Sequence, residues 1–253
     1  MVIKRGPRNP PKEVPMNFKH TLRINERRYT RRAEKNSRNS GVHGYISAMY
    51  IREDHPANDA ETIIAIAIDL QKHGINTPRV THRVSQLFAT ENAGADMHDV
   101  LLRLLNRPIL NRQRVKFLLS AAARQLGKMH SLEYSHHNSH FRNFVVKGSK
   151  VSIIDFKYTK KGKVNWNDPD NIYKHFWLDY AFLKTEFKNI INEQHEMMEK
   201  TGKSVGDELT RVFNQHVDLP KFLEKVISRY PTTEQVKSDV FERIKRELSL
   251  NDY

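Results

Sequence analysis

The side chains best suited to chemistry lie in one short segment of this sequence. A polar stretch carries His136, Asn138 and Asn143, two apolar strands joined by a tight turn are expected next, and Asp155 follows the second strand. Such a hairpin returns the chain to its start, so we expect Asp155 beside the polar stretch. Phosphoryl transfer requires phosphates that are held in place, a fixed Mg²⁺ ion and a group that orients the attacking hydroxyl. The segment offers the last two of these parts.

Simpler interpretations compete with this one. An aspartate at the end of a strand often caps a turn, but Asn143 at a fixed spacing before Asp155 favours metal binding. His136 and His140 also have the spacing of two zinc ligands on one helical turn. Polar neighbours favour a loop there, and the chain has no cysteine to complete a zinc site. Structural or phosphate-contacting histidines are therefore the favoured interpretation.

Hydrophobic periodicity predicts the elements that position this segment. Helices are expected at 59–73, 96–105, 112–132, 172–191, 205–216, 219–228 and 233–248, and strands at 79–84 and 86–90. A hairpin at 17–36 is a further expectation. Strands gather in the front of the chain and helices in the back, with a boundary near residue 92. This distribution predicts an α+β protein with two lobes and a cleft between them.

Other segments fit the same arrangement as the polar stretch. They are 74–80, 87–96, the helix end at 126–130, the run Asp155-Phe156-Lys157 without a following glycine, and Asp179. Together with the spacing of the polar stretch, these segments resemble the kinase-like superfamily, most closely the lipopolysaccharide-core (Kdo and heptose) kinases and related atypical kinases. The resemblance covers roughly residues 22–185 and is most specific over 126–156.

The resemblance implies a two-lobed protein-kinase-like fold, with a small strand-rich N-lobe and a larger helical C-lobe. Residues 1–16 would form a basic irregular tail, 17–92 the N-lobe, and 93–253 the C-lobe with the catalytic loop and the metal-binding hairpin. Asp179 would begin a helix and brace the catalytic loop through hydrogen bonds to its backbone. A plain helix N-cap is the alternative role for Asp179.

The resemblance also implies ATP and Mg²⁺ as cofactors. By position, Asp155 would bind the Mg²⁺ that bridges the phosphates, and Asn143 would serve the second metal position. His136 would brace the catalytic loop, and Asn138 would occupy the place of the catalytic base.

Further nucleotide contacts are implied in the front half of the chain. Glu91 lies in the hinge, whose backbone would hold adenine, and Arg32 or Lys35 would reach the phosphates. Glu61, near the start of the first apolar helix, would pair with that cation. The sequence carries no Gly-x-Gly-x-x-Gly to cover the phosphates, which departs from the pattern of ordinary protein kinases.

One departure lies at the centre of the chemistry. The family carries aspartate where this chain has Asn138, and an amide has no basic site that accepts a proton. General-base assistance contributes about 10²–10⁴-fold, whereas phosphoryl transfer depends more on positioning and electrostatics. An ATP- and Mg²⁺-dependent phosphotransferase and a pseudokinase that binds nucleotide without turnover therefore both stay open. The implied acceptor is a hydroxyl of an anionic, lipid-linked or lipopolysaccharide-type saccharide, or a protein serine or threonine.

Charge and composition indicate the partners. The formal net charge is +14, and residues 1–40 hold twelve Lys/Arg against three Glu. Such an arm attracts polyanions, which predicts peripheral contact with an anionic membrane face through 1–40. A solvated arm that only aids solubility and a nucleic-acid-binding protein, the less favoured partner class, are the alternatives. No apolar run reaches signal-peptide or transmembrane length, so we expect a cytoplasmic location.

Overall fold

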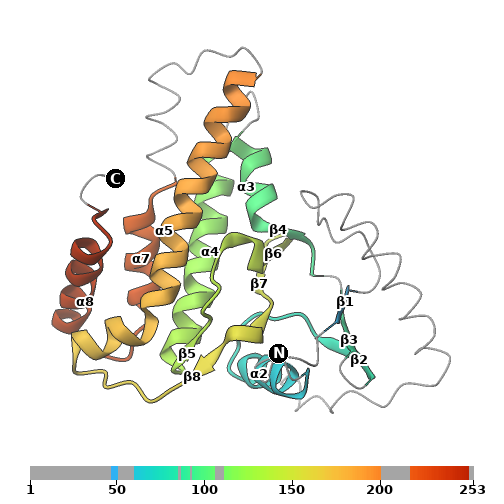
Figure 1. Cartoon of the computed structure of the whole chain (residues 1–253), viewed down its shortest axis with the longest axis horizontal. Helices are drawn as coiled ribbons and strands as arrows, with labels where there is room; N and C mark the ends of the chain where they lie inside the picture. The colour runs from blue at the N-terminus through green and yellow to red at the C-terminus, as the bar shows by residue number, and fades with distance from the viewer. Residues whose placement is uncertain are drawn as a thin grey trace, which may run out of the picture.

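The computed structural model describes residues 47–50, 60–84, 87–91, 93–105, 111–200 and 217–250 (Figure 1). The elements in chain order are β1 (Ser47–Tyr50), α2 (Ala60–Lys72), β2 (Val80–Val84), β3 (Leu87–Thr90), β4 (Ala95–Asp96), α3 (Met97–Leu105), α4 (Arg112–Ser131), β5 (Tyr134–Ser135), η2 (Phe141–Asn143), β6 (Phe144–Lys147), β7 (Lys150–Ile153), η3 (Phe156–Tyr158), β8 (Lys160–Lys161), α5 (Pro169–Lys200), α7 (Leu219–Ile227) and α8 (Glu234–Glu247). The tail expected at 1–16, the hairpin at 17–36 and the helix at 205–216 lie outside the described residues.

α4 is formed by apolar residues at helical spacing. Val115, Leu118, Ala122 and Leu126 recur every three or four positions, and all four are fully buried. The side chain of Asn111 caps the helix by accepting a hydrogen bond from a backbone N–H of the first turn. α4 packs against α7, and α5 packs against α3, α7 and α8 (Figure 1). The loop with the candidate site residues therefore leaves from a helix that is rigidly held in the core.

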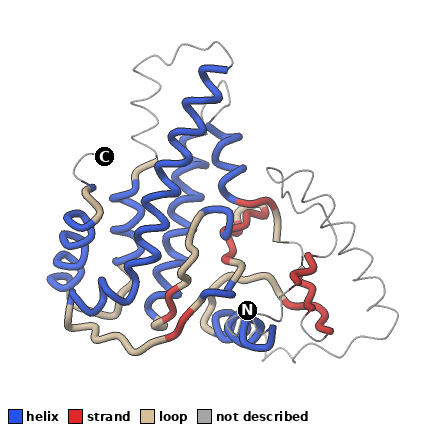
Figure 2. The backbone as a smooth tube through the Cα atoms, in the orientation of Figure 1, coloured by secondary structure: helices blue, strands red, loops and turns tan. Residues whose placement is uncertain are grey.

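Among the residues that the structure describes, three small antiparallel sheets accompany the helices (Figure 2). One has the strand order β1-β3-β2, the second β4-β6-β7, and the third pairs β5 with β8. In the second sheet, β6 and β7 form the expected hairpin, with Phe144 opposite Ile153 and Lys147 opposite Lys150. β4, β5 and β8 have two residues each, which is too short for hydrophobic periodicity to predict. The protein is thus a mixed α+β structure.

The segment after α2 is bonded to β7 and to α4. Gly74 has a φ of +76°, a conformation that favours glycine, and α2 ends just before it as predicted. The Asn76 carbonyl then accepts a hydrogen bond from Ile153 N at 2.9 Å, and the Asn76 side chain donates to the Val151 carbonyl at 3.0 Å. Asn76 N donates to Gln125 Oε1 at 2.7 Å. Asn76 therefore fixes the end of α2 against β7 and α4.

α5 is longer than the sequence predicts. It begins at Pro169, a residue favoured in the first turn of a helix, and runs to Lys200, whereas periodicity indicates only 172–191. The last turns carry mostly polar residues and so give no apolar pattern. Asp179 consequently lies inside α5, and its predicted place at a helix start is wrong. Neither α5 nor any other helix among the described residues is long and apolar enough to cross a membrane.

Candidate functional site

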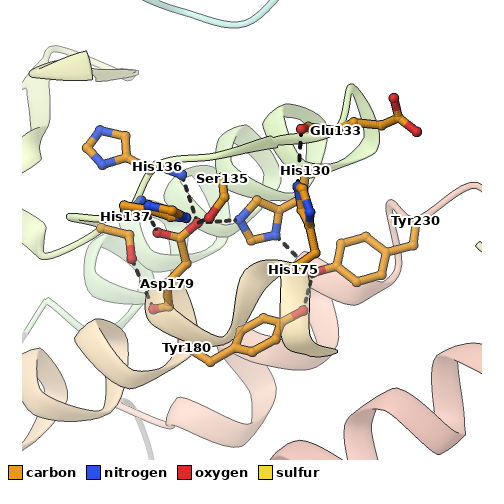
Figure 3. Close-up of polar contacts among 10 residues, drawn as sticks. His130, Glu133, Ser135, His136, His137, His175, Asp179, Tyr180 and Tyr230 are labelled. Atoms are coloured by element: carbon orange, nitrogen blue, oxygen red, sulfur yellow. Dashed lines mark hydrogen bonds and ion pairs between the residues drawn. The ribbon is translucent and has the colours of Figure 1, made fainter. Parts of the chain in front are cut away.

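Asp179 holds the 136–143 loop from inside the protein. Its side chain is fully buried, and its carboxylate accepts four hydrogen bonds (Figure 3). The donors are His136 N and His137 N at 2.8 Å, Ser135 Oγ at 2.9 Å and His130 Nε2 at 3.0 Å. Ser139 Oγ adds a bond to the Asp179 backbone carbonyl at 3.0 Å. One residue therefore braces the loop backbone, which is the contact that the sequence indicated for Asp179.

A buried aromatic group stands behind this carboxylate. His130 stacks on Phe176 with ring centroids 4.0 Å apart, and His130 Nδ1 lies 2.9 Å from the Tyr230 hydroxyl. The Tyr230 hydroxyl lies 2.6 Å from the Tyr180 hydroxyl (Figure 3). Because a carboxylate only accepts, Nε2 of His130 carries the proton and Nδ1 accepts from Tyr230. The hydrogen bonds therefore run in one direction, from Tyr180 through Tyr230 and His130 to Asp179.

Burial and hydrogen bonding set the charges of this network. Burial by itself would raise the pKa of Asp179, but the hydrogen bonds from His130 and from the His136 backbone outweigh it and lower the pKa to about 2. Burial lowers the pKa of His130 in spite of its bond to Asp179. The carboxylate is therefore ionised and the imidazole neutral at pH 7. An ionised carboxylate with four donors is a rigid support rather than a group that exchanges protons.

One hydrogen bond closes the loop on itself, and two more join the loop to the hairpin. Asn143 Nδ2 donates to the Asn138 carbonyl at 2.8 Å, which closes the loop on itself. Ile154 N donates to the Asn143 carbonyl at 2.9 Å, and His136 Nε2 donates to the Ile154 carbonyl at 2.9 Å. Ile154 immediately precedes Asp155. The structure therefore brings Asp155 to the loop that carries the other three residues.

Asp155 has an unusual backbone conformation. Its φ of 63° and ψ of 61° lie in the left-handed region, which is uncommon for a residue with a side chain. Within the described residues, Oδ1 is buried without a hydrogen-bond partner, and Oδ2 lies 3.5 Å from Lys157 Nζ. A bound cation would remove the desolvation penalty of such a buried oxygen. The Asp155 carboxylate thus fits Mg²⁺, which typically uses one or two carboxylates together with phosphates.

A mainly apolar cavity opens beside Asp155. Its walls come from α2, β2, β3, the segment after β3, β6 and the end of β7, through Ile63, Ile64, Ala67, Pro78, Val80, Thr90, Glu91, Ala93, Gly94, Val145, Ile154, Asp155 and Phe156. A volume of about 80 Å³ corresponds to about three water molecules at the packing of the liquid. The enclosed space is therefore much smaller than a whole nucleotide.

The cavity wall after β3 depends on Gly94. Its φ is +107°, and a Cβ at this position would lie 1.9 Å from the Val146 carbonyl oxygen, so only glycine lets the segment pass this close to β6. Before it, Glu91 N donates to the Arg79 carbonyl at 2.8 Å, and Glu91 Oε1 accepts from Arg79 N at 3.2 Å. Glu91 therefore lies in the cavity wall, but its carboxylate already contacts the backbone of Arg79.

The described contacts do not bring the other predicted residues to this site. Arg32 and Lys35 lie outside the described residues. Glu61 lies in the first turn of α2 with an exposed side chain, and the cavity wall, as far as it is described, does not include it. The described residues also contain no group of three His, Cys, Asp or Glu side chains arranged to hold a metal ion, which is the arrangement that zinc at His136 and His140 would need.

Two features of the site have no counterpart in the sequence reasoning. Tyr230 supports His130 from one hundred residues further along the chain, and no local pattern signals a contact at that separation. The pairing of Lys157 with Asp155 depends on the left-handed turn at Asp155. The one available signal is that a lysine stands two residues after the aspartate.

Comparison with known proteins assigns no family to the chain. A scan against protein-family models and a search of the curated proteins each found no match. The function is therefore inferred from the braced loop, the hairpin and the cavity.

Proposed function

We propose that the protein binds ATP at this cavity and transfers its γ-phosphoryl group to a hydroxyl, as a kinase-like phosphotransferase. The main support is that two chain segments meet at one point: the loop with Asn138 and Asn143, and the hairpin that ends at Asp155. Asp179 fixes the loop, and hydrogen bonds through Ile154 hold the hairpin against it. Such preorganised polar groups suit phosphoryl transfer, because its catalysis relies on positioning and electrostatics.

Each residue of the site has a role in this proposal. Asp155 and Asn143 would hold Mg²⁺, which neutralises phosphate charge when bound. The base of ATP would occupy the apolar cavity beside Glu91. Asn138 would orient the acceptor hydroxyl through its amide, which can both accept and donate a hydrogen bond. His136 would keep the hairpin in place against the loop.

The arrangement of the elements supports a two-lobed description. α2 and the β1-β3-β2 sheet lie on one side, α3, α4, α5, α7 and α8 lie on the other, and the chain passes between them after β3 (Figure 1). The cavity lies between the first group and the β6–β7 hairpin, from which Val145, Ile154 and Asp155 line it. Clefts between two parts of a chain are a common place for cofactors. We therefore propose that an N-lobe and a C-lobe divide near residue 92.

The positive charge of residues 1–40 favours an anionic acceptor. Residues 1–40 carry most of the net positive charge, which would attract an anionic molecule. A hydroxyl of an anionic, lipid-linked or lipopolysaccharide-type saccharide is the acceptor class that we favour, with a protein serine or threonine second. A cytoplasmic location, with residues 1–40 against the inner face of the membrane, belongs to the same proposal.

A nucleotide-binding protein without turnover is the second candidate function. Asn138 favours it, because its amide cannot accept the proton of an attacking hydroxyl. The ion pair between Lys157 and Asp155 also favours it, because the lysine already neutralises the carboxylate that would otherwise contact a metal ion.

Transfer of label from γ-labelled ATP, with Mg²⁺ and candidate acceptors, tests the proposal. Asp155→Ala should reduce transfer by about 10²-fold or more and should remove any gain in ATP affinity that Mg²⁺ gives. Asn138→Asp should raise transfer by about 10²–10⁴-fold, because it restores a general base. The control is Asp239→Ala, at an exposed position of α8, which should change neither quantity.

The outcomes separate the candidate functions. If the wild type neither binds ATP nor transfers label, and Asp155→Ala changes nothing, the phosphotransferase proposal is wrong. ATP binding without transfer, even in Asn138→Asp, would identify the second candidate. Tight and steeply salt-dependent binding to nucleic acid that is insensitive to Asp155→Ala would point instead to a nucleic-acid-binding protein.

A further inference from the structure

We propose that the ammonium group of Lys157 supplies positive charge to the phosphate site, so that nucleotide phosphates bind there without a divalent metal. In the nucleotide-free protein Lys157 neutralises Asp155, and a metal ion must compete with it for the same carboxylate. The inference rests on the proposed function, because it concerns the metal requirement of the same site.

The turn that follows Asp155 sets the position of Lys157. Asp155 is left-handed, and η3 makes a single turn that is anchored by the buried Phe156. Lys157 Nζ then lies 3.5 Å from Asp155 Oδ2 and 4.9 Å from the centre of the Tyr158 ring. An ammonium group is attracted both by a carboxylate and by the face of an aromatic ring. Lys157 is therefore held beside the carboxylate that a metal ion would use.

The charge of the site favours phosphate over a metal ion alone. Of the two candidate metal ligands, Asn143 is a neutral amide and Asp155 carries the single negative charge. Lys157 cancels that charge. The number of charged ligands largely sets the affinity of a divalent-cation site, so a single shared carboxylate makes a weak one. Phosphate oxygens, in contrast, approach this pair without net repulsion and can contact the ammonium group directly.

The ion pair can open when a ligand arrives. The Lys157 side chain is 36% exposed and that of Asp155 is 16% exposed, and ion pairs in contact with water contribute little to stability. Lys157 can thus leave Asp155 for a phosphate group. Asp155 lines the cavity, so a phosphate bound at the cavity edge lies within the reach of this lysine.

The pair determines how strongly metal and nucleotide assist each other. With Lys157 in place, phosphates meet no uncompensated carboxylate, and Mg²⁺ adds little to ATP affinity. Without Lys157, the Asp155 carboxylate repels the phosphates until a metal ion covers it. The two ligands then become strongly coupled, and the coupling factor is the same in both directions because binding free energies are linked.

Calorimetric titration of ATP into the full-length protein, once with EDTA and once with Mg²⁺, measures this coupling. The ratio of the dissociation constant in EDTA to that in Mg²⁺ should be within about fivefold of one in the wild type. In Lys157→Gln this ratio should be about tenfold larger, which is a range typical of coupled sites. Mn²⁺ alone should also bind more tightly to Lys157→Gln. Lys163→Gln, at an exposed lysine of the same segment, should match the wild type.

The results distinguish this inference from the proposed function. An unchanged ratio in Lys157→Gln, with ATP still bound, would overturn the role of Lys157 and leave the nucleotide site intact. Absence of ATP binding to the wild type in both buffers would overturn both proposals. The double variant Asp155→Asn/Lys157→Gln should bring the ratio back toward one, because the repelling carboxylate is gone. A ratio that stays high in the double variant would contradict the competition for Asp155.

Discussion

Asp179 is the residue on which the geometry of the site depends most. An ionised carboxylate that is fully buried is tolerated only when donors surround it, and here four donors do so. Two of them are backbone N–H groups at the start of the loop, and a third is the imidazole that Tyr230 orients. The loop conformation is therefore coupled to the core of the helical part through one side chain.

Asp179→Asn should lower the free energy of unfolding by about 3 kcal/mol. The amide keeps one acceptor oxygen but turns an NH₂ group toward donors such as the His136 N–H, which cannot pair with it. Urea denaturation followed by circular dichroism measures the change. The control Asp239→Asn, at an exposed site, should stay within about 0.5 kcal/mol of the wild type. Equal effects of the two variants would show that Asp179 does not support the loop.

Short contacts between elements, more than the long helices, place the site. Tyr134 in β5 donates to Asp69 in α2 at 2.8 Å, and Lys161 in β8 lies 3.7 Å from the same carboxylate. Burial, together with the hydrogen bond to Asp69, raises the pKa of Tyr134 to about 12, so the hydroxyl stays a neutral donor. These contacts tie α2, which forms one wall of the cavity, to both ends of the segment that carries the loop and the hairpin.

The chain at Gly94, just before β4, passes close to β6, and substitution of this glycine tests the close packing. Gly94→Ala should lower the free energy of unfolding by about 3 kcal/mol or more, because its Cβ would overlap the Val146 carbonyl and its φ is positive. Gly148→Ala, which also has a positive φ but meets open space, should cost about 1 kcal/mol. Urea denaturation gives both values. Gly94→Ala should also weaken ATP binding, and equal losses in the two variants would contradict the close packing at Gly94.

The molecule as a whole couples folding to pH through its histidines. Burial lowers the pKa of His130, His137 and His140, so below about pH 6.5 the unfolded chain binds protons that the folded chain does not. His98 acts in the opposite direction. Burial opposes its charge, but the hydrogen bond to Glu186 outweighs burial and raises its pKa. The stability from His98 is present below about pH 6.5 and is lost as the pH rises through its folded-state pKa.

The free energy of unfolding should therefore fall as the pH drops from 7 to 5. The slope is about 1.4 kcal/mol per pH unit for each extra proton that the unfolded state binds. Urea denaturation at several pH values measures it. His98→Gln should make the fall steeper and His130→Gln should make it shallower, and identical slopes would contradict these assignments. The contribution of Asp179, whose pKa is about 2, is lost only below about pH 4.

Local patterns in the sequence predict which segments of the candidate site meet better than they predict the distant side chains that hold these segments. The spacing of Asn143 and Asp155 around an expected hairpin indicates that they meet, and the hairpin does bring them together. Asp179 was expected to brace the loop and does so, but from inside α5 rather than at a helix start. The left-handed conformation of Asp155, which sets the position of Lys157, cannot be predicted from residue types alone.

What the sequence determined by itself is the set of elements with strong local signals. Apolar spacing defines α4 to within a residue, Gly74 marks the end of α2, and the hairpin follows from two apolar runs around a turn. Only the tertiary structure decided the partners: Tyr230 behind His130, Asp69 against Tyr134, and Lys157 on Asp155. Periodicity records which face of an element is buried. Which distant side chain meets that face depends on how the elements pack, and that information is spread over the whole chain.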